Sequence, residues 1–230
     1  MTAVFDLPSL PQVPVAGTEA TFPVRRIFCV GRNYAAHAAE MGVEVDREAP
    51  FYFTKTPWAI CQTGSTIPYP LETRDYHYEM EFVVAIGKPA FRVTTDTALE
   101  HVFGYACGLD MTRRDLQAQA KDTRRPWDLG KDVEDSAVIA AITPAAGFTP
   151  ADQRITLSVN GAVKQDATLT EMIWSVPEII AHLSRFYHLQ PGDLIFTGTP
   201  AGVGPVVAGD SMTGTIDGLA PVALTLGDPE

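Results

Sequence analysis

The chain has 230 residues and 46% of them are hydrophobic, which is enough to bury a substantial core in one compact domain. The formal net charge of −11 disfavours binding to nucleic acid or to an anionic membrane surface. No apolar run is long enough to cross a bilayer and no secretory signal pattern opens the sequence, so we expect a cytoplasmic protein.

The N-terminal part is predicted to hold an arm, a buried strand and a short helix. Residues 1–24 are rich in proline and weakly patterned, which is typical of an extended arm. The apolar stretch 26–30 indicates a short buried strand. Asn33 favours the start of a helix and Gly42 its end, so we expect a helix between them. Two further short strands are expected, at residues 51–54 and 58–61.

The middle of the chain contains the clearest strand pattern. Across residues 76–86 apolar side chains occupy alternate positions, which predicts a strand with one wholly apolar face. A short helix is expected at 96–102 and another strand at 105–109. Thr112, with an aspartate three residues on, resembles a capping box and predicts a helix that ends near Lys121. The apolar face of the first strand consists of Tyr78, Met80, Phe82, Val84 and Ile86.

Two local patterns stand out in the C-terminal part. Asn160-Gly161 lies between strand patterns at 154–159 and 162–166, and this is a strong indication of a tight β-hairpin. Ser175, with a glutamate three residues on, predicts an amphipathic helix through about Tyr187. The inward positions of this helix are Ile179, Ile180, Leu183 and Phe186.

The last elements complete a fold prediction. Pro191-Gly192 turns the chain into a strand at 193–197, and Asp217-Gly218 indicates a second hairpin. Many short strands with few, scattered helices predict an α+β fold built on a mixed β-sheet or β-roll. They do not fit a doubly wound α/β fold.

Glu79 and Glu81 are the central observation for function. Residues two apart on a strand share a face, so both carboxylates project opposite the apolar face. In a sandwiched strand they repel each other unless one is protonated, they pair with arginine or lysine, or they bind a cation. Asp110, after the strand at 105–109, offers a third hard oxygen ligand, and such a set suits Mg²⁺, Mn²⁺ or Ca²⁺ better than Zn²⁺. The alternative is an exposed glutamate pair at a sheet edge.

His37 and Glu40 are three residues apart on a predicted helix, close enough for the carboxylate to orient the imidazole. This is the arrangement of a general base positioned by an acid. A surface ion pair on an alanine-rich helix gives the same pattern.

Other polar residues have two interpretations each. Lys131 either stabilises a developing enolate or is one more solvated charge among acids. Arg114 and Gln117 follow Asp110 closely, and the alternative for them is an exposed basic turn. The glycine-rich stretch 198–204 offers backbone N–H groups to a carboxylate, or is simply a turn.

Together, six segments resemble the fumarylacetoacetate hydrolase family, and they occur in the family's order between about residues 25 and 226. They are CVGRNYAAHAAEMG (29–42), DYHYEMEFVVAIG (75–87), GYACGLDMTRRDLQ (104–117), the region around Lys131, NGAVKQ (160–165) and PGDLIFTGTPAGVG (191–204). One place departs from the pattern: many relatives have a Phe-Asp pair and a nearby proline after the lysine, whereas Asp132-Val133-Glu134 follow Lys131 here.

The resemblance implies the β-roll of the family's C-terminal domain, as a single catalytic domain at 25–230 in a homodimer, with a lid helix near 33–42. It implies that Mg²⁺ or Mn²⁺, with Ca²⁺ also possible, is held by three carboxylates. These metal ligands are Glu79, Glu81 and Asp110. The expected catalytic residues are His37, Glu40 and Lys131. The expected substrate-binding residues are Arg32, Arg114, Gln117, Gly198 and Thr199.

The resemblance also implies an enzyme that hydrolyses the C–C bond of a 2,4-dioxo acid. The sequences of these segments are most similar to those of the family's fumarylpyruvate-cleaving members, which act in gentisate degradation. The 2-oxo acid would chelate the cation, His37 would deprotonate water, and Lys131 and the cation would stabilise the pyruvate enolate. Candidates for a contact with a distal carboxylate are Arg32, Arg113 and Lys55.

Other functions stay open at this point. The same scaffold supports an oxaloacetate decarboxylase, an acylpyruvate hydrolase or a dehydratase. An alternative outside the enzymes is a non-catalytic, metal-dependent binding protein.

Overall fold

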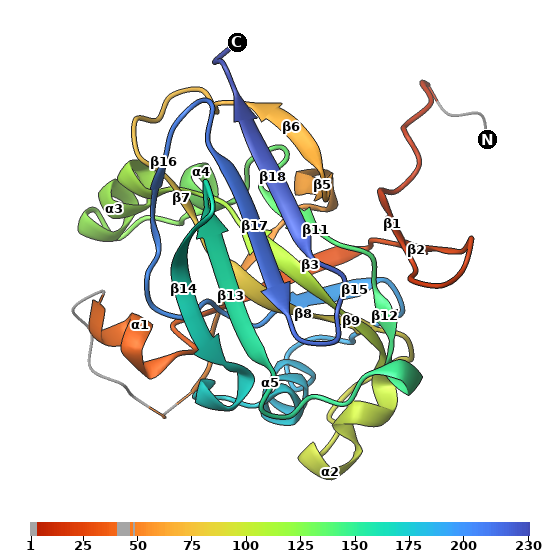
Figure 1. The fold of residues 1–230 in the computed structure, drawn as a ribbon. Helices are drawn as coiled ribbons and strands as arrows, with labels where there is room; N and C mark the ends of the chain where they lie inside the picture. Colours follow the sequence, from red (N-terminus) through yellow and green to blue (C-terminus); the bar gives the residue numbers. More distant parts are fainter. Residues whose placement is uncertain (1–3, 41–46, 48) are drawn as a thin grey trace.

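The computed structural model describes residues 4–40, 47 and 49–230. Its largest sheet has eight strands (Figure 1), and two of them contain Glu81 and Asp110. In spatial order the strands are β4 (Phe51–Lys55), β3 (Arg26–Gly31), β15 (Asp193–Phe196), β8 (Met80–Ile86), β9 (Val102–Asp110), β11 (Ala137–Ile139) and β5 (Ile60–Gln62), and β12 (Thr143–Pro144) also pairs with β9. Because β3 runs parallel to β15 while β8 runs antiparallel to β15 and β9, the sheet is mixed.

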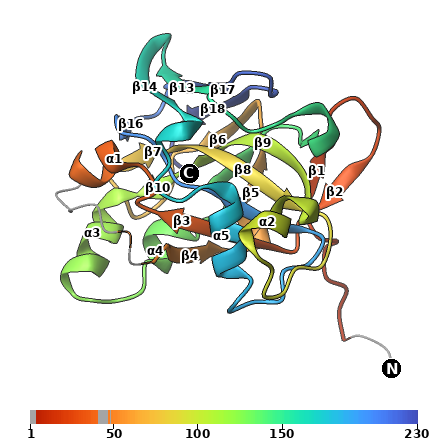
Figure 2. The same cartoon turned by 90° about the horizontal axis from the view of Figure 1, so that it is seen from below.

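A second layer of strands covers the first sheet, as Figure 2 shows. It is a five-stranded sheet of β14 (Ala162–Thr168), β13 (Arg154–Val159), β17 (Ser211–Ile216), β18 (Val222–Gly227) and β6 (Ser65–Pro68). Two small sheets complete the set: β10 (Thr112–Arg113), β7 (Tyr76–Tyr78) and β16 (Gly204–Val206), and the pair β1 (Gln12–Pro14) and β2 (Thr21–Pro23). The expected α+β fold with a mixed β-roll is confirmed.

The helices are short and lie around the sheets (Figure 1). The α-helices are α1 (Ala35–Glu40), α2 (Thr95–Ala98), α3 (Arg114–Asp122), α4 (Asp128–Lys131) and α5 (Val176–Leu183). The 3₁₀-helices are η1 (Pro57–Ala59), η2 (Leu99–His101), η3 (Ala145–Gly147) and η4 (Leu169–Glu171). Within the described residues, none of these helices has the length and apolar character needed to cross a membrane.

Strand β8 is buried on both faces, as its alternating sequence predicts. Met80, Phe82, Val84 and Ile86 point into a large core that also contains side chains of the five-stranded sheet and α5. Val83 and Ala85 point the other way, into a smaller core. Glu81 shares the face of Val83 because residues two apart on a strand point the same way. The sequence therefore places a carboxylate on the same buried face as the apolar Val83 and Ala85.

The strand predicted at 76–86 is divided in two at Glu79. Residues before it form β7, which pairs with β10 and β16, and residues after it form β8, which pairs with β9 and β15. The alternation of apolar residues continues through the break, so the sequence pattern alone gives no sign of it. Glu79 therefore lies where the chain passes from one sheet to another.

Two local predictions are confirmed at the level of hydrogen bonds and dihedral angles. Asn160 and Gly161 connect β13 to β14 with φ values of 50° and 80°, the left-handed conformations that a type I′ turn requires. Ser175 and Glu178 form the capping box that starts α5.

Two predicted helix caps are wrong because the side chains bind elsewhere. The side-chain oxygen of Asn33 accepts the backbone N–H of Trp174 (2.7 Å), and its side-chain nitrogen donates to the backbone oxygen of Thr197 (2.8 Å). Asn33 thus joins separate segments instead of starting α1. Likewise Thr112 belongs to β10, and α3 begins two residues later. Gly42, expected to end α1, lies outside the described residues.

Two further predictions differ from the structure in extent. Helix α5 ends at Leu183, because the buried Ser184 hydrogen-bonds Ala181 and the backbone of Val93 and so turns the chain. Phe186, predicted to face inward, is consequently 63% exposed. In the predicted arm at 1–24, β1 and β2 form a hairpin that buries side chains such as Phe22 against the smaller core.

Candidate metal centre

Three carboxylates meet where β7 passes into β8 and where β9 ends. Glu79 lies between β7 and β8, Glu81 is the second residue of β8, and Asp110 is the last residue of β9. The antiparallel pairing of β8 with β9 brings the three together. Each offers a side-chain oxygen that lies within 4.8 Å of the other two, and the residues are 5%, 1% and 0% exposed. The sequence-based expectation that these three residues share a site agrees with this geometry.

Lys131 lies among these carboxylates. Its ammonium group donates to Glu79 Oε2 (2.8 Å), to Asp110 Oδ2 (2.8 Å) and to Thr112 Oγ1 (2.7 Å). The guanidinium of Arg114 binds the other oxygen of Glu79. Lys131 is only 2% exposed, so the alternative of a solvated surface charge is excluded.

A second buried lysine, Lys55, holds the other side of Asp110. Its ammonium group lies 2.9 Å from Asp110 Oδ1 and donates to the backbone oxygen of Met111 (3.1 Å) and to Ser136 Oγ (2.8 Å). It also contacts the backbone oxygen of Lys131. Sequence reasoning proposed Lys55 for a distal carboxylate of the substrate. That proposal is wrong, because the whole side chain is buried in these contacts.

Glu81 is the carboxylate that most favours a cation. In the part of the chain that the structure describes, it accepts the backbone N–H of Gly198 (2.8 Å) and forms no ion pair. Burial, together with the charges of Asp110 and Glu79, raises the pKa of Glu81 well above its ordinary value. Burial acts in the same direction on Glu79, but the charges of Lys131 and Arg114 outweigh it and lower the pKa of Glu79.

This arrangement fits a hard divalent cation. The three ligands are carboxylate oxygens, which Mg²⁺, Mn²⁺ and Ca²⁺ prefer. A cation would also supply the positive charge that Glu81 lacks, and so relieve the cost of burying that carboxylate. The triad can therefore hold a divalent metal ion.

His37 and Glu40 form a hydrogen-bonded pair. His37 Nδ1 lies 3.3 Å from Glu40 Oε2. Burial lowers the pKa of His37, although Glu79 and Glu40 act in the opposite direction. The imidazole is 6% exposed, so it is not the solvated surface pair of the alternative interpretation. A neutral, oriented imidazole is the form that can accept a proton.

The glycine-rich turn after β15 binds two carboxylates of the site itself. Gly198 donates its N–H to Glu81, and Gly202 donates its N–H to Glu40 Oε2 (3.1 Å). Both glycines have φ near +95°, where other residues are strained. A Cβ on Gly198 would lie 2.7 Å from the Cβ of Asn33, and one on Gly202 would lie 2.1 Å from the backbone oxygen of Lys164. Close backbone approach therefore orients one carboxylate of the triad, Glu81, and the partner of His37.

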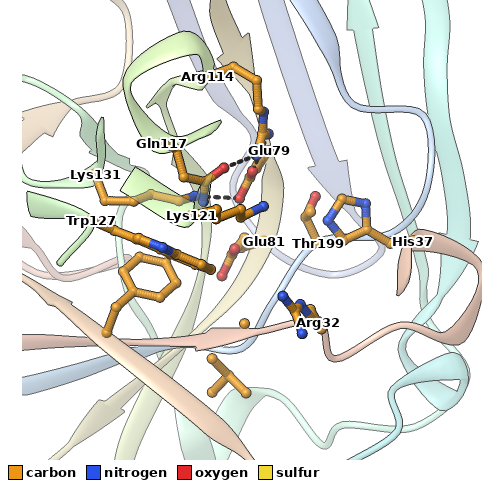
Figure 3. Close-up of a pocket in the computed structure, with 13 residues that line it drawn as sticks. Arg32, His37, Glu79, Glu81, Arg114, Gln117, Lys121, Trp127, Lys131 and Thr199 are labelled. Carbon is orange, nitrogen blue, oxygen red and sulfur yellow. Dashed lines mark hydrogen bonds and ion pairs between the residues drawn. The ribbon is translucent and has the colours of Figure 1, made fainter. Parts of the chain in front are cut away.

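A cavity of about 30 Å³, enough for an ion or a water molecule, lies at the centre of these groups (Figure 3). Helix α3 presents one face to it, because residues three and four apart on a helix are neighbours. On that face, Arg114 Nη1 donates to Gln117 Oε1 (2.7 Å). The full set of lining residues is Val30, Gly31, Arg32, His37, Phe53, Glu79, Glu81, Arg114, Gln117, Lys121, Trp127, Lys131 and Thr199.

Most of the predicted substrate-binding residues lie at this cavity. Arg32, Arg114, Gln117 and Thr199 line it, while Gly198 contributes its backbone N–H to Glu81. Residues 132–134, which differ from the family pattern, do not line this cavity. Asp132 instead accepts the backbone N–H of Thr56 (2.8 Å).

Several site residues escaped sequence reasoning. Lys121 and the aromatic residues Phe53 and Trp127 line the cavity. For Lys121 the only sequence signal was its helical spacing from Arg114 and Gln117. The two aromatic residues gave no signal. The buried Gln165 accepts the N–H of Met80 (2.9 Å) and donates to Thr199 Oγ1 (2.8 Å). Gln165 comes from the second sheet, so no local pattern links it to the site.

Arg113, also suggested for a distal carboxylate, does not line the cavity. It faces a different surface pocket, formed with Tyr76, Val133 and Asp135.

Comparison with known proteins agrees with the geometry. Residues 26–226 match the family model described as fumarylacetoacetate (FAA) hydrolase C-terminal. A fumarylpyruvate hydrolase from a Ralstonia species is 55% identical over 83% of this chain and 100% of its own. An oxaloacetate tautomerase from Escherichia coli is 38% identical over 88% of this chain and 93% of its own.

A solved structure extends the likeness to three dimensions. The crystal structure of fumarylpyruvate hydrolase from Pseudomonas aeruginosa in complex with Mn²⁺ and pyruvate is 46% identical, with a TM-score of 0.95. The match covers 99% of this chain and 100% of that one. A family model that spans nearly the whole chain, together with relatives at this level of identity, decides the classification: this chain is a member of the fumarylacetoacetate hydrolase family.

Proposed function

We propose that this chain is a metal-dependent hydrolase that cleaves the C–C bond of a 2,4-dioxo acid, with fumarylpyruvate as substrate and fumarate and pyruvate as products. The observation that carries the proposal is the buried triad of Glu79, Glu81 and Asp110 beside a cavity lined by both glutamates and by His37, the hydrogen-bond partner of Glu40. The 55% identity to a fumarylpyruvate hydrolase supports the substrate. The relative in complex with Mn²⁺ and pyruvate supports Mn²⁺, or the chemically similar Mg²⁺, as cofactor.

The residues of the site suit each step. A divalent cation held by the triad supplies Lewis acidity and a positive charge for the 2-oxo acid end of the substrate. His37, oriented by Glu40, takes a proton from water, and the hydroxide adds to C4. The bond between C3 and C4 then breaks, and its electron pair remains on the pyruvate half as an enolate. Protonation of C3 yields pyruvate.

Lys131 is the side chain proposed to stabilise the negative charge of the enolate. Although burial opposes its charged form, Asp110 and Glu79 raise the pKa of Lys131, so it stays an ammonium ion. An ammonium ion fixed in a dry site stabilises a developing enolate better than water does, because it needs no reorganisation. Arg114, Gln117 and Thr199 line the same cavity and are proposed to contact the substrate.

A related activity is the second candidate. The 38% identity to an oxaloacetate tautomerase favours proton transfer on oxaloacetate, which needs the cation and an acid–base group but no attack by water. The two candidates therefore differ in whether a C–C bond is broken.

We also propose that the chain acts as a homodimer in the cytoplasm, with a single catalytic domain at 25–230.

The test is product analysis with fumarylpyruvate, acetylpyruvate and oxaloacetate, each with Mn²⁺, with Mg²⁺ and with a chelator. We expect stoichiometric fumarate and pyruvate from fumarylpyruvate, only when a cation is present. The His37→Ala variant serves as a control that keeps the metal ligands. Interconversion of the tautomers of oxaloacetate with no cleavage of either dioxo acid would contradict the hydrolase proposal and support the second candidate.

A further inference from the structure

Two cationic side chains of the cavity are not explained by the metal centre. Arg114 and Lys131 are each ion-paired with Glu79. Arg32 and Lys121 line the same cavity, but no ion pair joins either of them to an acidic residue in the ranges that the structure describes. In a chain with a net charge of −11, two such cations beside one small cavity are a local excess of positive charge.

Lys121 is held in place at the cavity wall. It lies on α3, four residues after Gln117 and seven after Arg114, so the three share one helix face. Its ammonium group lies 5.0 Å from the centre of the Trp127 ring, a cation–π contact that fixes the group over a flat apolar surface. Figure 3 shows its side chain directed toward the middle of the cavity.

The surroundings of Lys121 favour an anion. Burial, together with the charges of Arg114 and Arg32, lowers the pKa of Lys121. These effects arise because cations lie close together in a partly desolvated place, and an anionic group bound there would relieve the repulsion. Arg32 contributes the second charge from the turn after β3, where its guanidinium lies 6.0 Å from the centre of the Phe51 ring.

There is room for a longer substrate beside this wall. A wider cavity of about 320 Å³ adjoins the central one and shares the walls formed by Phe53, Trp127 and Lys131. A planar, conjugated chain can lie along the Trp127 ring, with its far end near the ammonium group. A fumaryl group has this planar shape and ends in a carboxylate.

On the basis of the function proposed above, we propose that Lys121, assisted by Arg32, binds the carboxylate at the far end of the substrate. The chain is then selective for 2,4-dioxo acids that carry a second carboxylate over those that end in a methyl group. The pyruvate half is common to both kinds of substrate and stays with the triad, Lys131 and Arg114. Selectivity therefore arises from α3 and from the turn after β3.

The first test compares kcat/KM for fumarylpyruvate and acetylpyruvate in the Lys121→Met variant. A charge-assisted contact in a partly dry site is strong enough that we expect about a tenfold to hundredfold loss for fumarylpyruvate, mainly through KM. Acetylpyruvate should change by less than about threefold. Lys121→Arg should restore part of the selectivity. Arg32→Asn, which keeps a residue type tolerant of the positive φ of Arg32, should produce a smaller loss of the same kind.

The matched control is Lys88→Met. Lys88 is exposed and lines neither the central nor the wider cavity, so its loss should leave the selectivity unchanged. If Lys121→Met keeps the wild-type preference for fumarylpyruvate, the assignment to Lys121 is overturned. An equal loss for both substrates in Lys121→Met would also overturn it, because Lys121 would then act on the shared pyruvate half.

A binding measurement separates this inference from the hydrolase proposal. Fumarate and pyruvate are titrated calorimetrically into Mn²⁺-loaded protein. Lys121→Met should weaken fumarate binding about tenfold or more and leave pyruvate binding unchanged. This result supports the subsite even if neither dioxo acid is cleaved. Unaltered fumarate binding would refute the subsite even if hydrolysis is confirmed.

Discussion

Replacement of Lys55 by methionine tests how Asp110, a proposed metal ligand, is held. The ammonium group of Lys55 contacts Asp110, Met111 and Ser136 at 2.8 to 3.1 Å, and its side chain has no exposed surface. Methionine is similar in length and fills the space without a charge. Removal of one partner of a buried ion pair costs about 3–5 kcal/mol, and the lower figure applies because Asp110 keeps Lys131 at 2.8 Å.

The assay is urea denaturation of the wild type and the Lys55→Met variant in chelator. With a slope near 3 kcal/mol per molar urea, a loss of about 3 kcal/mol lowers the midpoint by about 1 M. Saturating Mn²⁺ should restore part of this loss, because a cation beside Asp110 replaces the missing positive charge. The exposed lysine Lys88 provides the control variant, Lys88→Met. A loss below about 1 kcal/mol, or a loss equal to that of the control, would refute the reasoning.

Three further predictions concern the metal centre and the His37–Glu40 pair. Glu79→Gln or Asp110→Asn should abolish activity and weaken Mn²⁺ binding in calorimetry, and full activity in chelator would contradict this. His37→Ala should reduce C–C hydrolysis by about a hundredfold to ten-thousandfold with Mn²⁺ affinity unchanged; a native rate would exclude the general-base role. Because burial lowers the pKa of His37 from 6.5 and the base must be neutral, the acid limb of kcat/KM should lie below pH 6.5. Glu40→Gln removes interactions that raise this pKa, so it should move the limb further down, and an upward shift would be inconsistent.

Sequence patterns predicted the elements whose stabilising contacts are local. The hairpin at Asn160-Gly161 depends on the φ preferences of two adjacent residues, and the start of α5 depends on hydrogen bonds between Ser175 and Glu178. Alternation across 76–86 predicted the buried face of β8, because a strand buried in a core needs apolar residues at every second position. In each case a short window of sequence contains the physical cause.

Predictions failed where the partner of a side chain is distant in the sequence. Asn33 has the right chemistry for a helix cap, but its hydrogen bonds go to residues 141 and 164 positions away. Lys55 was one of three candidates for a contact with the substrate, because its real partner, Asp110, is brought beside it only by the order of strands in the sheet. Lys121 was missed for a similar reason: its helical spacing puts it on the face of Arg114 and Gln117, but only the folded chain shows that this face lines the cavity.

The charge balance of the centre explains why a cation and an anionic substrate belong together there. The charges of Lys55, Lys131 and Arg114 offset those of the three carboxylates, so the buried group is close to neutral before any ligand binds. A divalent cation held by the triad would make the group strongly positive, and in a buried site that excess would favour an anion. Lys131, which bridges two of the proposed ligands, would share Glu79 and Asp110 with the cation. In the proposed reaction its ammonium group would gain from contact with a new oxygen anion, and the enolate of pyruvate would supply one when the C–C bond breaks.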